Sequence, residues 1–372
     1  MNNLCKIPFL HKYINFIDAS EKPCCIFQGQ ESIIDVQKKF LSNERPKGCS
    51  ECWRREDNNI LSKRQHFNNS FPDHNIDSGI KTYDLRLGIT CNLKCVMCGP
   101  HLSTKWNEDK SIFEKHINKI NDTPHEIEEL NFDEAVEIYF AGGEPFYMKE
   151  VHDCLLKLSE REFNRKNTKI RINTNAIIDK DNKVLKLLNN FEKIEFTISV
   201  EGLGEVNDYI RYPSKWKDFL KGVKLIYEMS DQPKTIEEMF KCNRSVVFNI
   251  TISCLNLLNI HHLFHWLTDE NYLYVANFVE EPKLLNINSL KITVIDDFLW
   301  RHESFDYKYD HLQDVVNYIT DNYSYNDTLN SKMKLYLQDL DIKRNTNSKQ
   351  LLSWCWACVY FAVLPLMDFI KD

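Results

Sequence analysis

The chain has 372 residues, of which 43% are hydrophobic and 27% charged, and its formal net charge is −7 at pH 7. This composition is that of a globular protein and excludes an intrinsically disordered one. The acidic balance also argues against a nucleic-acid-binding protein, which would carry a clustered basic face.

The N-terminal region, residues 1–78, is rich in cysteine and irregular in its hydrophobic pattern, with helical spacing only over residues 31–41. Its first residues lack the apolar core and cleavage site of a signal peptide, so we expect a cytoplasmic protein. Because disulfides are disfavoured there, we interpret the clustered cysteines among the chain's 13 as metal ligands. A region this poor in core residues is predicted to need a bound metal in order to fold.

Short β-rich segments alternate with amphipathic stretches over the central region, residues 79–290. Strands are predicted over residues 82–87, 136–141, 169–173, 193–200, 245–252 and 272–278. Helices are predicted over residues 151–163, 182–190, 215–229 and 260–268. Six such units predict an α/β fold, a partial (β/α)6 TIM-like barrel.

The C-terminal region, residues 291–372, is predicted to be helical, with helical spacing over residues 310–320 and 330–340. It ends in an apolar run, residues 354–367, which is shorter than the roughly 20 residues that span a bilayer. We therefore expect a buried element there and no membrane anchor. Cys355 and Cys358 lie in this run and are interpreted as packing residues, with a metal or redox role as the alternative.

A cysteine motif of spacing C-x3-C-x2-C, made of Cys91, Cys95 and Cys98, directly follows the first predicted barrel strand. Three thiolates on one tight loop can bind three irons of a [4Fe–4S] cluster, which leaves the fourth iron without a protein ligand. An open metal position of this kind is where chemistry occurs, whereas an electron-transfer cluster normally takes four cysteines. A zinc loop is the alternative, although structural zinc sites have four ligands in paired spacing.

This motif resembles the signature of the radical S-adenosylmethionine (SAM) superfamily, and the sequence CNLKCVMCGP resembles the version in its SPASM/twitch branch. Further matches follow at predicted strand ends in the family's order: Gly142-Gly143-Glu144-Pro145, Thr174-Asn175-Ala176 and Ser199-Val200-Glu201-Gly202. Arg211 lies shortly after the last of these. Two positions depart from the usual pattern. Glu201 stands where aspartate is common, and Ala176 replaces a glycine, which predicts a less tight turn.

The resemblance implies an enzyme that reductively cleaves SAM at the [4Fe–4S] cluster and abstracts a hydrogen atom from its substrate. Gly142 and Gly143 would let the backbone approach SAM closely. Glu144 would accept hydrogen bonds from the SAM ammonium, and Arg211 would bind the SAM carboxylate. The ribose would be bound by three strand-end residues, Asn175, Ser199 and Glu201. No catalytic acid or base is assigned, because the cofactor carries the difficult chemistry.

The same resemblance implies a substrate and an electron donor. Members of this branch often modify ribosomally made peptides or proteins, and flavodoxin or ferredoxin would supply the electron. Two alternatives stay open: a non-catalytic iron–sulfur or zinc scaffold that binds a partner, and a radical enzyme that modifies a nucleic acid or a small metabolite. SAM cleavage would exclude the scaffold, and a salt-dependent affinity for RNA or DNA would support a nucleic-acid substrate.

The N-terminal cysteines resemble an auxiliary-cluster module of the same branch. The expected ligands of this second [4Fe–4S] cluster are Cys5, Cys24, Cys49 and Cys52. Cys25 is the alternative to Cys24, because the side chains of adjacent residues point in different directions. Four thiolates are also a structural zinc site, which stays open as an interpretation.

Three further cysteines, Cys154, Cys242 and Cys254, are interpreted as structural, although Cys254 follows a predicted strand and could face the active site. His261 and His265 are four positions apart on a predicted helix. They lack the glutamate and the third ligand of a convincing metal site, so we expect them on the surface of an outer helix.

Overall fold

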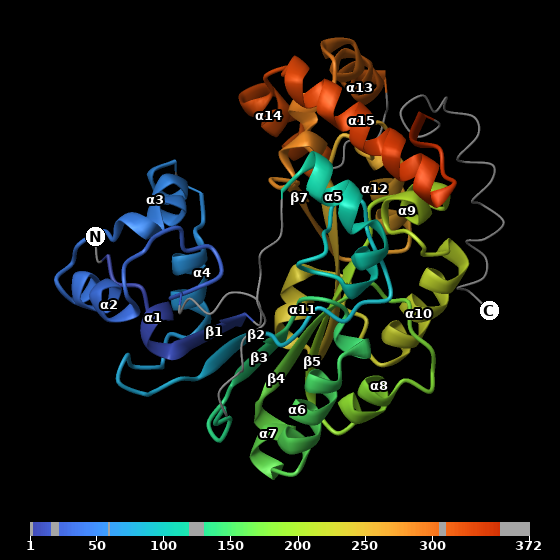
Figure 1. The fold of residues 1–372 in the computed structure, drawn as a ribbon. Coiled ribbons are helices and arrows are strands. Elements are labelled where there is room, and N and C mark those ends of the chain that lie inside the picture. Colours follow the sequence, from blue (N-terminus) through green and yellow to red (C-terminus); the bar gives the residue numbers. More distant parts are fainter. Residues whose placement is uncertain (1–2, 16–21, 59, 119–129, 305–309, 350–372) are drawn as a thin grey trace.

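Seven parallel strands form one sheet in chain order, from β1 to β7 (Figure 1). This computed structural model describes residues 3–15, 22–58, 60–118, 130–304 and 310–349. The strands are β1 (His11–Asn15), β2 (Thr82–Arg86), β3 (Glu137–Phe140), β4 (Lys169–Thr174), β5 (Lys193–Ser199), β6 (Arg244–Ile252) and β7 (Tyr274–Phe278). The predicted α/β fold with a parallel sheet is confirmed.

All six predicted strands are present, but β1 adds a seventh from the N-terminal region. Its five residues pair in register with β2, from His11 opposite Thr82 to Asn15 opposite Arg86. The predicted number of strands was therefore wrong. The sequence HKYIN does not alternate between apolar and polar residues, so it gives no strand pattern. In the structure all five of its residues are half-buried.

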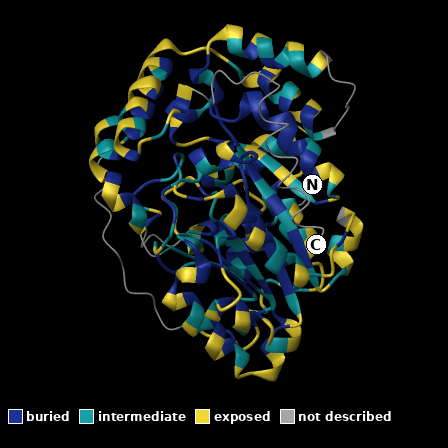
Figure 2. Ribbon diagram, turned by 90° about the vertical axis from the view of Figure 1, so that its right-hand side faces the viewer, coloured by how far each residue is buried: buried dark blue, intermediate teal, exposed yellow. Residues whose placement is uncertain are grey.

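The two faces of the sheet differ in polarity. Most residues of the strands are buried or half-buried, whereas exposed residues lie mainly on the outer helices and loops (Figure 2). One face presents fully buried apolar residues such as Ile138, Ile170 and Phe196. These share the main core with side chains of four helices, α6 (Lys149–Ser159), α8 (Lys183–Leu188), α10 (Trp216–Glu228) and α12 (Ile260–Asp269). Residues whose side chains point to the other face, such as Arg86 and Asn173, are polar and half-buried. Parallel sheets usually bury apolar side chains on both faces, so a polar face is the side where a polar ligand could contact the strands.

The N-terminal module (residues 3–15, 22–58 and 60–78) lies beside the β1 edge of the sheet, in blue in Figure 1. Its helices are α1 (Ile7–Leu10), α2 (Ile33–Leu41), α3 (Ser50–Asp57) and α4 (Lys63–Ser70). It has a small core of its own, in which Phe27, Phe40 and Trp53 pack with Cys5 and Cys24. The helix predicted over residues 31–41 is confirmed as α2, which starts after Ser32 because that hydroxyl accepts a hydrogen bond from Asp35 N.

The C-terminal region is helical, as predicted. It contains α13 (Ile292–Ser304), α14 (Asp310–Asn322) and α15 (Asp327–Arg344). Figure 1 shows α15 next to α5 (Lys110–His116), which follows the cysteine motif. The remaining helices are α7 (Glu162–Asn167), α9 (Glu205–Ile210) and α11 (Ile236–Lys241). The apolar run with Cys355 and Cys358 lies outside the described residues. Within the part that is described, no helix is long and apolar enough to span a membrane.

Candidate active site

The cysteine loop (residues 89–98) follows the carboxyl end of β2 and brings Cys91, Cys95 and Cys98 close together. Burial first, and the neighbouring Cys95 thiol second, raise the pKa of Cys91 to about 12. The pKa of Cys98 is raised by burial and then by Cys95 and Cys91. The three thiols are therefore near enough for charge on one to disfavour charge on another. Negative charge gathered in this way is what bound iron would neutralise, so the donor set fits a cluster.

Backbone hydrogen bonds hold this loop in place. Lys94 N donates to Tyr212 O at 2.7 Å, and Val96 N donates to Ile210 O at 2.7 Å. On the other side, the Trp106 indole donates to Cys95 O at 3.0 Å. Because these partners come from separate segments of the chain, the spacing of the thiols is set by the tertiary structure as well as by the motif.

Gly142 and Gly143 follow β3 and lie against the cysteine loop. Both have a positive φ, 81° and 48°, which favours glycine. A Cβ on Gly143 would lie 2.4 Å from Thr90 O, while Glu144 N donates to the same oxygen at 2.8 Å. The two loops therefore approach as closely as their backbones permit, which requires glycine at position 143.

Glu144 is buried between the ends of β3 and β4. Its carboxylate accepts hydrogen bonds from Asn175 N at 2.7 Å and from the Thr174 hydroxyl at 2.8 Å. Burial raises the pKa of Glu144 to about 7, although these hydrogen bonds oppose the rise. The side chain of Asn175 in turn donates to Asn92 Oδ1 at 2.8 Å. Glu144 thus joins three loops of the site, a role that the motif Gly142-Gly143-Glu144-Pro145 does not reveal by itself.

Glu201 and Arg211 form a buried ion pair, with a 2.9 Å contact between Arg211 Nη2 and Glu201 Oε1 and a second bond from Nε. Arg211 also lies near Cys95, where its charge opposes the rise in the thiol pKa that burial causes. From the sequence, each of these two side chains was expected to have its own contact with SAM. In the structure they bind each other, so contacts with SAM would use the remaining donors of Arg211 and acceptors of Glu201.

The remaining strand-end residues also gather at this edge. Ser199 donates to Asn173 Oδ1 at 3.3 Å. Ala176 has a φ of 57°, so the expectation of a less tight turn was wrong: the alanine adopts the left-handed conformation that glycine favours. No role was expected for Asn92 or Asn256 from the sequence. Asn256 is buried and donates to Glu201 O at 2.9 Å, and only its position after β6 hinted at a role.

The polar face of the sheet carries a row of charged residues below these loops. Arg171 contacts Glu195 at 2.7 Å and Glu137 at 3.1 Å across neighbouring strands. Arg86 is half-buried at the carboxyl end of β2, next to Gly142, whose added Cβ would lie 3.3 Å from Arg86 Cβ. Arg86 is thus a charged side chain between the polar face and the glycine loop, and no sequence motif indicated it.

In the N-terminal module, Cys5, Cys24, Cys49 and Cys52 lie near one another. Burial is the main reason that the pKa of Cys5 is raised, and Cys24, Cys49 and Cys52 raise it further. Burial, and then the neighbouring thiols of Cys24 and Cys52, raise the pKa of Cys49 to about 12.

Cys25 points elsewhere, because its sulfur accepts a 2.8 Å hydrogen bond from Lys63 Nζ. This geometry favours Cys24 over Cys25 as a ligand. Throughout the described ranges, no three His, Cys, Asp or Glu side chains are arranged to hold a single metal ion.

The other residues that the sequence singled out are three cysteines and two histidines. Cys254 is 3% exposed, and burial raises its pKa to about 12. Cys154 and Cys242 are half-buried. His261 is buried on α12 rather than on the surface, so the expectation of a surface histidine was wrong for this residue. His265 contacts Asp269 of the same helix at 3.2 Å.

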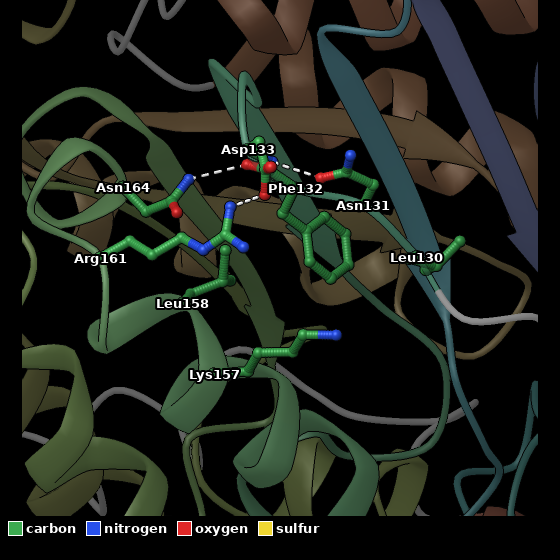
Figure 3. A pocket seen from close by; sticks show the side chains of 8 residues that line it. All are labelled: Leu130, Asn131, Phe132, Asp133, Lys157, Leu158, Arg161 and Asn164. Atoms are coloured by element: carbon green, nitrogen blue, oxygen red, sulfur yellow. Dashed lines mark hydrogen bonds and ion pairs between the residues drawn. The ribbon is translucent and has the colours of Figure 1, made fainter.

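A cavity of about 350 Å³ lies elsewhere, between the segment before β3 and helices α6 and α7 (Figure 3). Arg161 and Asp133 form an ion pair at its wall, and Asn164 donates to Phe132 O at 2.9 Å. These residues precede β3 and β4, so the cavity is at the amino ends of the strands. The cysteine loop is at the carboxyl ends, where barrels build their active sites.

Comparisons with known proteins bear on the central region. Residues 85–241 match the model of the radical SAM superfamily. The uncharacterized protein MJ0907 of Methanocaldococcus jannaschii is 28% identical over 152 residues, which is 40% of this chain and 49% of that protein.

Two solved structures share 15% and 13% sequence identity with this chain, each at a TM-score of 0.37. SuiB of Streptococcus suis is matched over 78% of this chain and 55% of its own. A histidine-tagged form of anSMEcpe with bound AdoMet is matched over 54% of this chain and 50% of its own. The chain thus spans about half the length of the proteins that it matches.

Proposed function

We propose that this chain, whose match over residues 85–241 supports membership in the radical SAM superfamily, is an enzyme that reductively cleaves SAM. The observation that carries the proposal is the cysteine loop at the carboxyl end of β2, where three thiols gather beside the glycine loop and Arg211. A [4Fe–4S] cluster and SAM held there would supply the radical chemistry, in which one electron from the reduced cluster cleaves SAM and a hydrogen atom is taken from the substrate.

The residues around the loop have distinct parts in this proposal. Cys91, Cys95 and Cys98 would hold the cluster. Gly142 and Gly143 would let SAM approach the backbone, because neither carries a side chain there. Arg211 would place a positive charge near the carboxylate of SAM and near the thiolates.

Glu144 acts mainly as a positioning residue, since its carboxylate already binds Asn175 and Thr174. Its two oxygens can accept further hydrogen bonds, so the predicted contact with the SAM ammonium remains part of the proposal. Asn175, Ser199 and Glu201 would bind the ribose from the ends of β4 and β5.

The N-terminal module would hold a second [4Fe–4S] cluster on Cys5, Cys24, Cys49 and Cys52. Four thiols near one another, all with a raised pKa, support this assignment. Four cysteines leave no iron open for SAM, so this cluster would transfer electrons or contact the substrate. A flavodoxin or ferredoxin would deliver the electron from outside.

A peptide or protein is the proposed substrate, on the strength of the resemblance to the SPASM/twitch branch. The polar face of the sheet supports a substrate with many hydrogen-bonding groups, because Arg86, Tyr139 and Asn173 are half-buried there. The polar backbone of a peptide would suit such a surface.

SAM cleavage tests the proposal directly. We expect the anaerobically reconstituted protein to release 5′-deoxyadenosine from SAM when dithionite is added. Cys95→Ala should lower that release at least a hundredfold, because the cluster loses one of its thiolates. Cys242→Ala is the matched control and should leave it unchanged, since Cys242 lies in neither cysteine group. Equal release by Cys95→Ala, or uptake of zinc without cleavage by the wild type, would contradict the proposal.

A further inference from the structure

Helix α15 reaches the cysteine loop from 240 positions further along the chain. The fully buried hydroxyl of Tyr336 donates a 2.9 Å hydrogen bond to the carbonyl oxygen of Val96, between Cys95 and Cys98. A buried carbonyl needs such a donor, so this bond helps to set the path of the loop. The contact ties the last described helix to the proposed site of SAM cleavage.

Arg344, near the end of the same helix, is buried behind the loop. Its Nε donates to Asp109 Oδ2 at 2.8 Å, and its side chain is 2% exposed. The guanidinium lies 4.8 Å from the ring centre of Trp106 and 5.1 Å from that of Tyr212. These two residues hydrogen-bond to the backbone of the loop, at Cys95 and Lys94. Arg344 therefore packs against both residues that hold the backbone of the cysteine loop, Trp106 and Tyr212.

The two terminal nitrogens of Arg344 have no hydrogen-bond partner among the described residues. Nη1 and Nη2 are buried, and neither forms a hydrogen bond in the structure as described. Burying unused donors of a charged group is costly, which points to an acceptor that binds nearby. Trp106 links the guanidinium to Cys95, because its ring lies against Arg344 and its indole N–H donates to Cys95 O at 3.0 Å.

We propose that Tyr336 and Arg344 belong to the cluster site. Tyr336 positions the cysteine loop, and Arg344 joins Arg211 in placing positive charge beside an anionic iron–sulfur cluster. The inference rests on the proposed function. Because local charge and hydrogen bonds to the sulfurs set the potential of such a cluster, Arg344 favours its reduced state and raises its reduction potential.

A redox titration tests whether the positive charge of Arg344 raises the reduction potential of the cluster. The signal to follow is the electron paramagnetic resonance signal that changes when SAM is added, because SAM binds only the cluster with an open iron. Arg344→Gln should shift its midpoint potential to a lower value. Lys343→Gln removes the same charge from the neighbouring, exposed position of α15 and should leave the potential unchanged. A folded Arg344→Gln protein with the wild-type potential would overturn the role of Arg344.

The rate at which the protein loses its cluster tests the hydrogen bond from Tyr336 to Val96 O. Tyr336→Phe removes one oxygen and keeps the packing, so it should fold even where Arg344→Gln does not. Loss of the SAM-responsive signal to an iron chelator should be about fivefold faster, the effect of one buried hydrogen bond. Tyr325→Phe, at an exposed tyrosine, is the control and should not change that rate. A wild-type rate in Tyr336→Phe would overturn the positioning role.

The two proposals can fail separately. A wild-type protein that takes up iron but shows no SAM-responsive signal would contradict the proposed function. A wild-type protein that shows this signal, with variants that match it in potential and retention, would contradict only the roles of Tyr336 and Arg344.

Discussion

Glu144 shows how burial and hydrogen bonding compete at one side chain. Three donors, Phe146 N, the Thr174 hydroxyl and Asn175 N, point at its carboxylate and favour the charged form. Burial disfavours that form by more, and the pKa rises from 4.5 to about 7. The folded chain therefore keeps a proton on Glu144 at pH values where the unfolded chain has lost it.

A pH dependence of stability follows from Glu144. Between pH 4.5 and about 7 the folded state binds more protons at this residue, so its contribution to the free energy of unfolding falls as pH rises, by about 3 kcal/mol in total. We expect Glu144→Gln to remove this part of the pH dependence. Glutamine also turns an N–H toward the donors, so the variant should be less stable by about 1–3 kcal/mol at pH 5.

Urea unfolding between pH 4.5 and 8 measures the effect of Glu144→Gln. The exposed Glu160→Gln variant is the control and should follow the wild-type curve. A constant difference in unfolding free energy between wild type and Glu144→Gln across this range would contradict the assignment.

Helix α10 shows how an element far from the chemistry supports the site. Gly222 is buried in the middle of this helix, where glycine lowers helix stability relative to alanine by about 1 kcal/mol. An added Cβ would lie 1.7 Å from Ala176 O, in the loop that follows β4. The helix therefore packs directly on the backbone of the loop that presents Asn175.

In Gly222→Ala, helix propensity and packing would change the unfolding free energy in opposite directions. Alanine would gain about 1 kcal/mol from propensity, but a backbone carbonyl cannot move aside as a flexible side chain can. We expect packing to dominate, so that the variant loses about 1–3 kcal/mol of unfolding free energy overall. Lys221→Ala, at the adjacent exposed position, should change stability by less than about 0.5 kcal/mol. Thermal or urea unfolding decides the sign, and a stabilised Gly222→Ala protein would refute the packing argument.

At the scale of the whole molecule, the N-terminal module and the sheet meet through β1 and through adjacent cysteines. Cys24 faces the other cysteines of the module, whereas Cys25 contacts Lys63 at 2.8 Å. Cys25 also lies beside Asp84 and Arg86 of β2. One turn of the chain thus links the proposed auxiliary cluster to the polar face of the sheet.

Iron content distinguishes these neighbouring cysteines. Two [4Fe–4S] clusters predict about eight irons per chain after anaerobic reconstitution. Cys24→Ser should reduce this to about four, because the auxiliary cluster loses a ligand. Cys25→Ser should keep about eight, since that thiol points away from the other four. Loss of iron in Cys25→Ser with full loading of Cys24→Ser would reverse the assignment, and bound zinc in the wild type would replace the auxiliary cluster with a zinc site.

Local patterns in the sequence predicted strands β2 to β7, several of the helices and the cysteine loop. Period-two alternation marks β4 and β6, whose inward and outward residues differ in polarity. The motif of Cys91, Cys95 and Cys98 spans eight residues, and Gly142 and Gly143 stand directly after β3. Each of these features depends on residues that are neighbours in the chain, so the order of residue types is sufficient to predict it.

Only the tertiary structure decided which distant residues meet. The polar segment of β1 forms a strand because its backbone pairs with β2. Glu201 and Arg211 became a buried pair, and Tyr336 reached Val96 across 240 positions. Such contacts arise when the whole chain packs its apolar surface, and no pattern of neighbouring residues encodes them. The sequence by itself therefore determined the chemistry that the site can hold, and the packing of distant segments decided how that site is built.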